Sequence, residues 1–597
     1  MKRALFIGIA LLWAHSLLAQ TEVSFSRQGG FYEECFPLTL GCAEGFHIRY
    51  TMNGSTPTDE SFIYTEPLAL DEKCYSKSNI YTIVDCIPST YYAVEDVKHA
   101  IVIRAAAFDE NGTCVSPVAT QTFFIKALGC DLHGLPVLSL AADSLDLFDY
   151  ETGIFVPGVN YNWADSMGTG NYMMKGREWE RPINIEFYEP DNSGVNQRCG
   201  LRTHGGASRR FQQKGMRLYA REEYGKKRFK HRFFETTALA NFKHLNLHPF
   251  RCSNWLHTGG QEYLSQRVAT QLDVDGLNVR QIVVFLNGEY WGIYTLEESP
   301  DERYLEDHYD VDLDLVNIIK YWGVLSYGDG MDWWGFRSWI ENADLNQPSD
   351  SAHAFSRMDV HSFIDYYLLE VYGANLDWPQ NNVLLWQAEN GEPFRMMFYD
   401  GDGCFTRWYY KAMAHSLVEG GNSLIINKFM ESEAFKVMLY ERYCELSSTV
   451  FSNYTLNAVW DDYRDLVEDE VPFQSNRFGF PKSVQRWQAD MDSVRVFFTK
   501  RPHTFHKEMQ EMFAFTPSML NEIAVYPNPC NGIFDIHVAS EVCSIVPTAI
   551  YDMTGRLVYV NDYFLRPGDN VIKVNTSLRS GLYVVNIGGI IKKMVIQ

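Results

Sequence analysis

The chain has 597 residues, which is enough for about three to five domains. Hydrophobic residues make up 46% and charged residues 21% of it, a composition typical of globular proteins. Its 52 basic and 75 acidic residues give a formal net charge of -23. Because phosphate backbones and anionic lipids are bound by basic surfaces, this charge excludes nucleic acid as the main partner and argues against electrostatic attachment to a membrane.

Residues 1–19 have the pattern of a secretory signal peptide. Lys2 and Arg3 precede an apolar run at 4–13, and the small residue Ala19 ends the segment. We therefore predict export and cleavage after Ala19. No later stretch reaches roughly 18 apolar residues, so we predict no transmembrane segment.

The chain has 12 cysteines, which fits disulfide formation in an oxidising compartment. Half of them lie in the first quarter of the chain: Cys35, Cys42, Cys74, Cys86, Cys114 and Cys130. Their pairing stays open, and the alternative is that several are buried thiols. Neither a CxxC nor an HExxH motif occurs, so we expect neither a structural zinc site nor a zincin-type protease.

Residues 21–127 have the pattern of a small all-β domain. Short apolar runs at 36–40, 47–52, 81–84 and 101–108 are separated by turn signals such as Asn53-Gly54-Ser55. The run "YTMNGSTPT" (50–58) resembles the chitobiase/β-hexosaminidase C-terminal-type domain. The resemblance makes a cell-surface glycan a candidate partner, although we favour the alternative of a β-sandwich spacer. We expect this module to be dispensable for nucleotide binding, because it contains no catalytic-type cluster.

Residues 523–597 again have an all-β pattern. The pieces "VYPNPCNGIFDI", "IYDMTGRLVY" and "LRSGLYVVNI" closely resemble the type IX secretion system type A sorting domain. That resemblance implies a Bacteroidetes-type Gram-negative cell, a secretion machinery that binds this tail, and a protein that is secreted or displayed on the outer-membrane surface.

The strongest constellation lies in the middle region, 128–515. A helix is predicted at 360–372, because its apolar residues recur at helical spacing. A loop with Asp377 and Asn382 follows, and two strands, at 383–386 and 394–399, lead to Asp400 and Asp402. The loop and the carboxylate pair should therefore lie at the same end of one hairpin.

This arrangement matches the catalytic loop of kinases, in which an Asp lies five residues before a metal-binding Asn (382 − 377 = 5). Asp377 would orient the acceptor hydroxyl. Asn382, Asp400 and Asp402, the last two placed on one side of a strand, would hold Mg²⁺. The alternative is that Asp, Asn and Asp-Gly occur here only as turn formers.

The upstream elements follow the order of a kinase small lobe. A Gly-rich turn is followed by a strand that begins at Lys214, a helix near 260–272 that begins at Glu262, and a hairpin at 279–296 that ends in acidic residues. The candidate nucleotide-binding residues are Gly205, Gly206, Ser208, Lys214, Glu262 and Glu298. The alternatives are a solvated strand-end charge for Lys214 and an exposed first-turn carboxylate for Glu262.

Four segments resemble the CotH spore-coat kinase family: "GLRTHGGASRRFQQKGMRLY" (200–219), "LNGEYWGIYTLEE" (286–298), "NLDWPQNN" (375–382) and "FYDGDGCF" (398–405). The likeness covers about 135–515 and implies a secreted atypical protein kinase that uses ATP and Mg²⁺ to phosphorylate Ser. It carries over Asp377, Asn382, Asp400, Lys214 and Glu298. Two departures stand out: the turn reads His204-Gly205-Gly206-Ala207-Ser208, and the loop lacks His-Arg before Asp377.

We therefore predict a multidomain fold with an α+β, atypical-kinase-like middle domain flanked by two small all-β sandwich domains. The predicted function is transfer of the ATP γ-phosphoryl group to Ser or Thr of a surface or extracellular protein. The alternative is a catalytically inactive surface adhesin or glycan-associated scaffold. A glycoside hydrolase is a weaker rival, because its two carboxylates must face each other across an open cleft. The acceptor protein and the oligomeric state stay open.

Overall fold

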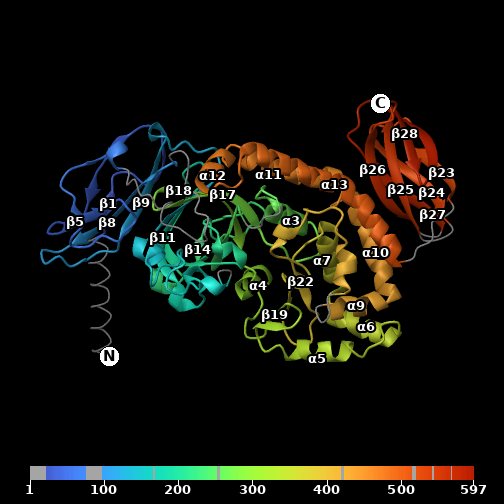
Figure 1. The fold of residues 1–597 in the computed structure, drawn as a ribbon, viewed down its shortest axis with the longest axis horizontal. Coiled ribbons are helices and arrows are strands. Elements are labelled where there is room, and N and C mark those ends of the chain that lie inside the picture. Colours follow the sequence, from blue (N-terminus) through green and yellow to red (C-terminus); the bar gives the residue numbers. More distant parts are fainter. Residues whose placement is uncertain are drawn as a thin grey trace, which may run out of the picture. The chain divides into compact units, whose positions relative to one another are not determined.

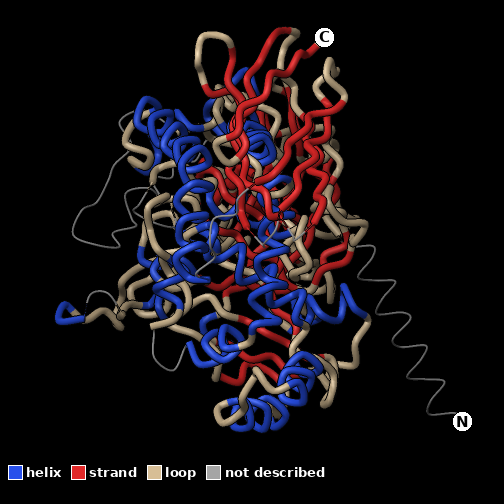
Figure 2. Tube along the Cα trace, turned by 90° about the vertical axis from the view of Figure 1, so that its right-hand side faces the viewer, coloured by secondary structure: helices blue, strands red, loops and turns tan. Residues whose placement is uncertain are grey.

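The computed structural model describes residues 22–74, 97–165, 168–251, 256–418, 423–513, 520–540, 544–565 and 568–597. The predicted signal peptide and the predicted strand at 81–84 lie outside this range. The chain divides into two compact units. Unit 1 comprises residues up to 259, 278–299 and 463–489, and unit 2 comprises 260–277, 300–462 and 490–597. Helices and strands are both abundant (Figure 2), and the fold is multidomain as predicted, with all-β parts at both ends of the chain and a mixed middle.

Unit 1 begins with the predicted all-β module. Its main sheet has the strand order β2-β9-β8-β5-β6, and two small strand pairs, β1-β4 and β3-β7, complete it. Its apolar core includes Leu38, Ile103 and Phe123. The strands are β1 (Ser24–Phe25), β2 (Gly30–Tyr32), β3 (Phe36–Leu38), β4 (Leu40–Gly41), β5 (His47–Thr51), β6 (Phe62–Ile63), β7 (Leu68–Leu70), β8 (Ile101–Phe108) and β9 (Ala119–Ile125).

The second part of unit 1 is a closed barrel with the strand order β10-β11-β12-β13-β16-β18-β17. Its strands β11, β17 and β18 are labelled in Figure 1. Leu218, Leu247 and Trp291 lie in its core. The predicted two-residue turn is confirmed, because Asn287 and Gly288 have φ values of 49° and 85°. The strands are β10 (Val137–Ala141), β11 (Arg181–Tyr188), β12 (Gly194–Thr203), β13 (Met216–Tyr219), β16 (His244–Pro249), β17 (Val279–Leu286) and β18 (Glu289–Glu298).

The module and the barrel share buried contacts. Phe124 of the module and Phe285 of the barrel lie in one apolar cluster, with their ring centroids 5.0 Å apart. The N–H of Ala100 donates to the carbonyl of Gly288 at 2.7 Å. Lys98 forms a buried ion pair with Glu470 of the 463–489 segment, at 2.9 Å. Removing the module would therefore expose apolar and charged groups of unit 1 that are buried in the intact chain.

Glu186 of β11 is a buried carboxyl at this junction. Thr122 of the module donates to it from its N–H (3.1 Å) and its hydroxyl (2.5 Å), and Tyr188 donates from its hydroxyl (2.5 Å). Burial outweighs these bonds and raises the pKa of Glu186 to about 7. The folded state therefore favours the protonated carboxyl, and the stability that this provides is present below about pH 4.5 and is lost as the pH rises through 7.

Glu186→Gln is expected to remove much of this pH dependence. The raised pKa corresponds to roughly 3 kcal/mol of unfolding free energy lost by the parent between acidic and alkaline pH. The amide keeps an acceptor oxygen for Thr122 and Tyr188 and does not ionise. Urea unfolding at pH 5 and pH 8 measures the loss, and exposed Glu151→Gln is the control. An equal loss in the parent and Glu186→Gln would contradict the assignment.

Unit 2 contains most of the helices and a four-stranded sheet of order β20-β19-β21-β22. The hairpin β21–β22 is the one predicted to carry the functional loop. The strands are β19 (Asn317–Lys320), β20 (Val324–Tyr327), β21 (Leu384–Gln387) and β22 (Arg395–Met397). The helices are α3 (Gln261–Ala269), α4 (Glu302–Tyr309), α5 (Met331–Ile340), α6 (Pro348–Arg357), α7 (Val360–Gly373), α8 (Ala412–Ser416), α9 (Leu424–Glu431), α10 (Glu433–Ser448), α11 (Asn453–Val467) and α13 (Val484–Phe513); α11 and α13 cross the boundary with unit 1, and α12 (Val471–Phe478) lies in unit 1.

The C-terminal part consists of two antiparallel sheets, β23-β24-β27 and β26-β25-β28-β29. Phe534, Ile550 and Val585 contribute to one apolar cluster formed by both sheets, which makes this part a sandwich. The strands are β23 (Leu520–Tyr526), β24 (Ile533–Ser540), β25 (Ser544–Asp552), β26 (Leu557–Leu565), β27 (Gly568–Asn575), β28 (Gly581–Ile587) and β29 (Ile590–Ile596).

Among the described cysteines of the first quarter of the chain, Cys130 is a buried thiol, Cys42 is half-buried, and Cys35 and Cys114 are exposed thiols. The buried-thiol alternative is therefore supported for Cys130. Within the described parts of the chain, no helix is both long and apolar enough to cross a membrane.

Candidate active site

The candidate site starts at the C-terminal end of α7. The Asp359 side chain caps the start of this helix by accepting from the N–H of Ser362 at 3.1 Å. The helix ends where Ala374 takes a left-handed conformation, with φ 55°. Tyr366, Tyr367 and most other α7 side chains are buried, so the loop that follows projects from a fixed helix.

The loop keeps Asp377 near its start by local hydrogen bonds. The Asp377 N–H donates to the side-chain oxygen of Asn375 at 3.1 Å, and the Asp377 carbonyl accepts from the N–H of Asn381 at 3.0 Å. Trp378 is buried, and its indole N–H donates to the hydroxyl of Tyr366 at 2.9 Å. Trp378 therefore anchors the loop to α7 and also fills the core.

Asn382 and Asp400 lie together at one end of the β21–β22 hairpin, as the sequence predicted. The amide nitrogen of Asn382 donates to the backbone carbonyl of Asp400 at 3.1 Å. The backbone carbonyl of Asn382 accepts from Tyr366 at 3.2 Å. With its amide nitrogen engaged, Asn382 has its amide oxygen as the atom that can bind a cation.

Asp377 is electrostatically coupled to Asp400. Burial and, next, the nearby Asp400 carboxylate raise the pKa of Asp377. A hard divalent cation held by the Asp400 carboxylate and the Asn382 amide oxygen would offset the repulsion between Asp400 and Asp377.

Asp402 does not follow the strand geometry predicted for it. β22 ends at Met397, and Gly401–Gly403 forms a 3-10 turn that begins after Asp400, itself left-handed with φ 60°. Side chains two residues apart in such a turn do not point the same way, as they would on a strand. The prediction that Asp400 and Asp402 lie two positions apart on a strand is therefore wrong.

Glu262 is a further carboxylate that lies close to Asp400 within unit 2. It lies in the first turn of α3 and is 2% exposed, so the alternative of a solvated carboxylate is wrong. One of its carboxylate oxygens lies within 4.8 Å of one of Asp400. It also accepts from the N–H of Gly401 at 2.5 Å, while Ser265 donates to the Gly401 carbonyl at 2.9 Å. Two side chains of α3 thus bind both backbone polar groups of Gly401, the residue after Asp400.

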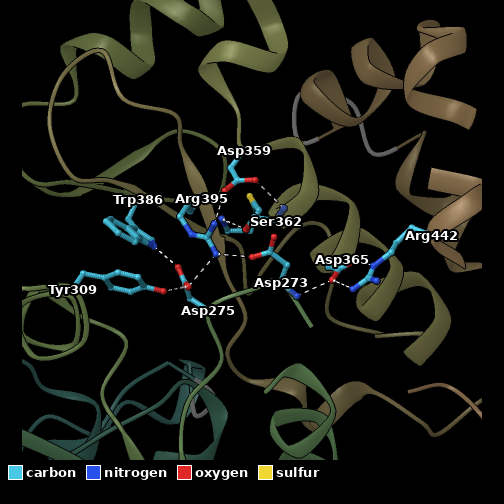
Figure 3. Close-up of polar contacts among 10 residues, drawn as sticks. Asp273, Asp275, Tyr309, Asp359, Ser362, Asp365, Trp386, Arg395 and Arg442 are labelled. Atoms are coloured by element: carbon cyan, nitrogen blue, oxygen red, sulfur yellow. Dashed lines mark hydrogen bonds and ion pairs between the residues drawn. The ribbon is translucent and has the colours of Figure 1, made fainter. Parts of the chain in front are cut away.

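A charged network fixes the β21–β22 hairpin to its surroundings (Figure 3). Arg395 of β22 pairs with Asp359 at the start of α7, with Asp273 at 3.1 Å and with Asp275 at 3.5 Å. Asp275 also accepts from Tyr309 and from Trp386 of β21. These donors hold the buried Asp275 carboxylate in one orientation, and Asp275 in turn ties β21, β22 and α4 together. The sequence showed only separate charged residues here.

Arg501 of α13 is a second group that the sequence did not identify as functional. It is fully buried, and its guanidinium donates to the carbonyls of Tyr372 (2.9 Å), Trp408 (3.2 Å) and Tyr410 (2.8 Å). It therefore ties the end of α7 to the segment after the Asp400 loop. A buried Arg with backbone partners far apart in sequence leaves no local sequence signal.

The predicted nucleotide-binding residues other than Glu262 lie in unit 1. Lys214 precedes β13 instead of starting it and is 0% exposed, which rules out a solvated strand-end charge. Its ammonium donates to the carbonyls of Arg209 (3.0 Å) and Phe211 (3.1 Å) and lies 4.4 Å from the Tyr172 ring centroid.

The Gly-rich turn is exposed at Gly205 and Gly206, and Gly205 has a φ of 97°. This φ disfavours any side chain at Gly205, and a Cβ there would also lie 2.3 Å from the hydroxyl oxygen of Ser208, which would have to move. Glu298, at the end of β18, accepts from the backbone and side chain of Asn278 at 3.0 and 2.8 Å. The Lys214 carbonyl, in contrast, accepts from the hydroxyl of Tyr294 at 3.0 Å, and Tyr294 lies four residues before Glu298 on β18. Lys214 and Glu298 therefore contact different positions along β18.

The chain matches three family models. Residues 38–123 match "Fn3 associated", and residues 524–597 match "Secretion system C-terminal sorting domain". These ranges lie within the predicted domains, although the predicted boundaries and the chitobiase-type likeness stay predictions. The tail carries a sorting domain of the type that directs secretion or surface display.

Among solved structures, the chain is similar to the proinflammatory kinase CtkA of Helicobacter pylori, at 10% identity and a TM-score of 0.20. The match covers 45% of this chain and 91% of that chain. No curated protein matches the chain.

The third family model is "CotH kinase protein", which matches residues 201–505 and so spans the Gly-rich turn, the barrel strands that follow it, the catalytic-type loop and Arg501. This range is slightly more than half of the 597 residues. The chain therefore belongs to the CotH kinase protein family.

Proposed function

We propose that the chain is a secreted or surface-displayed protein kinase that transfers the γ-phosphoryl group of ATP to a Ser or Thr hydroxyl of another protein. The observation that supports this most is the hydrogen bond, 3.1 Å long, from the amide nitrogen of Asn382 to the backbone carbonyl of Asp400. This bond places the two residues side by side, and the Asp400 carboxylate also raises the pKa of the nearby Asp377. Family membership favours ATP as the phosphoryl donor.

Each residue has a distinct role in this proposal. Asp377 orients the acceptor hydroxyl and accepts its proton late in the transfer. Asp400 and the amide oxygen of Asn382 hold Mg²⁺, which would neutralise charge on the phosphates. Glu262 is a further candidate on the same side, because its oxygen approaches that of Asp400 within 4.8 Å. Asp402 stays a weaker metal candidate.

The small-lobe residues contribute to nucleotide binding in the same proposal. The exposed backbone of Gly205 and Gly206 and the Ser208 hydroxyl offer donors to phosphate oxygens. Lys214 and Glu298 are proposed to shape the nucleotide site from the barrel, through their contacts with Phe211 and Asn278.

One observation favours a second function, that of a non-catalytic surface scaffold. Lys214 uses its ammonium to bind two backbone carbonyls and lies against Tyr172, which is how a structural lysine is held. In that case the kinase-like part would present a binding surface, and a cell-surface glycan would be the candidate ligand of the N-terminal module.

Incubation of the full chain with γ-labelled ATP distinguishes the two functions. A kinase is expected to incorporate label on Ser or Thr in the presence of Mg²⁺ and to lose incorporation when EDTA is added. A chain that neither incorporates label nor binds ATP would be a scaffold, and the proposed function would be wrong.

A chain that ends at residue 519, just before β23 begins at Leu520, is expected to accumulate inside the cell. The reason is that residues 524–597 match a sorting domain. Cell fractionation and protease treatment of intact cells measure the location, with the full chain as the control. Delivery of the shortened chain to the surface or medium would contradict the proposed role of this domain.

A further inference from the structure

Glu370 is a buried carboxyl on α7 that no predicted role uses. It lies in the last turn of the helix and is 0% exposed, next to the equally buried Leu369 and Val371. Burying a carboxyl among apolar side chains is costly unless hydrogen bonds compensate it. Its presence at this position therefore requires a reason beyond filling the core.

The contacts of Glu370 are directed at the candidate catalytic loop. Its side chain accepts from the amide nitrogen of Asn375 at 2.8 Å, and its backbone carbonyl accepts from the Asn375 N–H at 3.0 Å. Asn375 is 0% exposed and in turn accepts, through its side-chain oxygen, from the N–H of Asp377 at 3.1 Å. A continuous chain of hydrogen bonds thus runs from Glu370 through Asn375 to Asp377.

Asn375 lies two residues before Asp377, at the position where ordinary kinase loops have a histidine. Ordinary kinase loops read His-Arg-Asp, whereas this chain reads Asn375-Leu376-Asp377. The first residue of the triplet is therefore an amide, whose two ends bond in opposite directions. A single rotamer of Asn375 can satisfy both Glu370 and Asp377, and Glu370 selects that rotamer.

The other carboxyl oxygen of Glu370, Oε1, is also buried. Burial raises the pKa of Glu370 to about 8; hydrogen bonds with Asn375 and Tyr366 lower it, and the Glu262 and Asp400 carboxylates raise it further. A neutral carboxyl adds no negative charge near Glu262 and Asp400. It still has an oxygen that accepts the hydrogen bond from the amide nitrogen of Asn375.

We propose that Glu370 is a positioning residue for phosphoryl transfer, which sets Asn375 so that Asn375 holds Asp377 in the orientation that meets the acceptor hydroxyl. This inference rests on the proposed kinase function. It assigns no contact between Glu370 and the nucleotide, so its loss affects the transfer step and leaves Mg·ATP binding in place.

The test compares Glu370→Leu and Glu370→Gln in the full chain. Displacement of a reacting group by about 1 Å can cost roughly 10²-fold in rate, so Glu370→Leu is expected to lower kcat by about that factor with little change in the Kd for Mg·ATP. Glu370→Gln keeps an acceptor oxygen and a neutral side chain. It is expected to restore kcat to within about threefold of the parent, as a rotamer-setting role requires.

Asp365→Asn is the matched control for a general loss of stability. Asp365 is a buried acid on the same helix, but it pairs with Arg442 of α10 at 2.7 Å and accepts from the N–H of Asp273 at 2.7 Å, so these contacts lie outside the 374–382 loop. Thermal unfolding is measured for all variants. Asp365→Asn is expected to lower the midpoint of unfolding with kcat retained in the folded fraction.

Two results overturn the inference alone: an active parent whose Glu370→Leu variant keeps its kcat, or a Glu370→Gln variant that loses as much kcat as Glu370→Leu. A parent that binds no Mg·ATP and transfers no phosphoryl group overturns the proposed function and this inference together.

Discussion

Asp377→Asn is expected to reduce phosphoryl transfer by about 10²–10⁴-fold, the usual contribution of a positioned proton acceptor. Its affinity for Mg·ATP should change little, because Asp377 is proposed to orient the acceptor hydroxyl and not the metal. The substitution is isosteric, and the bonds that hold the loop use the backbone N–H and carbonyl of residue 377. A steady-state transfer assay beside a nucleotide-binding titration measures both quantities.

The control for this experiment is Asp312→Asn, the same change at an exposed position. It should leave both rate and affinity at the parent values. If Asp377→Asn transfers as fast as Asp312→Asn, the loop at 374–382 is not catalytic, and the scaffold function gains support.

Lys98→Met is expected to lower the free energy of unfolding by about 3–5 kcal/mol, the usual cost of removing one partner of a buried ion pair. The side chains of Lys98 and Glu470 are 4% and 1% exposed, and their charged atoms lie 2.9 Å apart. The ammonium also lies 3.5 Å from the Phe473 ring centroid. Methionine keeps the length of the side chain but leaves Glu470 buried without this counter-charge.

Lys126→Met is the matched control, because Lys126 is 52% exposed and its nearest carboxylate oxygens lie 3.6 and 3.8 Å away. Exposed pairs contribute about 0–1 kcal/mol, so this variant should unfold close to the parent. Urea unfolding measures both. Equal, small losses in the two variants would mean that the Lys98–Glu470 pair does not stabilise the packing of the 97–100 segment against the 463–489 segment.

The local elements of the site were predictable from sequence because their signals are local. Asn-Gly fixed the turn of the β17–β18 hairpin, and helical spacing of apolar residues located α7. The spacing of Asp377 and Asn382 identified the loop. The pattern of two short strands joined by a turn placed Asp400 at the same end of the β21–β22 hairpin.

The parts that the sequence left out depend on contacts between distant segments. Glu262 is buried because the N–H of Gly401, 139 positions along the chain, donates to it. Lys214 is buried by its own turn and Tyr172. Asp402 departs from the strand pattern because the backbone turns at left-handed Asp400. Glu370 was a missed residue with a sequence signal, because it is an acid directly between the apolar residues Leu369 and Val371 of α7.

The central claim is that Asp400 and Asn382 hold Mg²⁺ for a bound nucleotide. Calorimetric titration of ATP into the full chain, with Mg²⁺ and with EDTA, tests it most directly when the parent is compared with Asp400→Asn. The account predicts Mg²⁺-dependent binding by the parent and its loss in Asp400→Asn, with unchanged thermal unfolding. Equal binding by both proteins, or binding by the parent that does not depend on Mg²⁺, would contradict it.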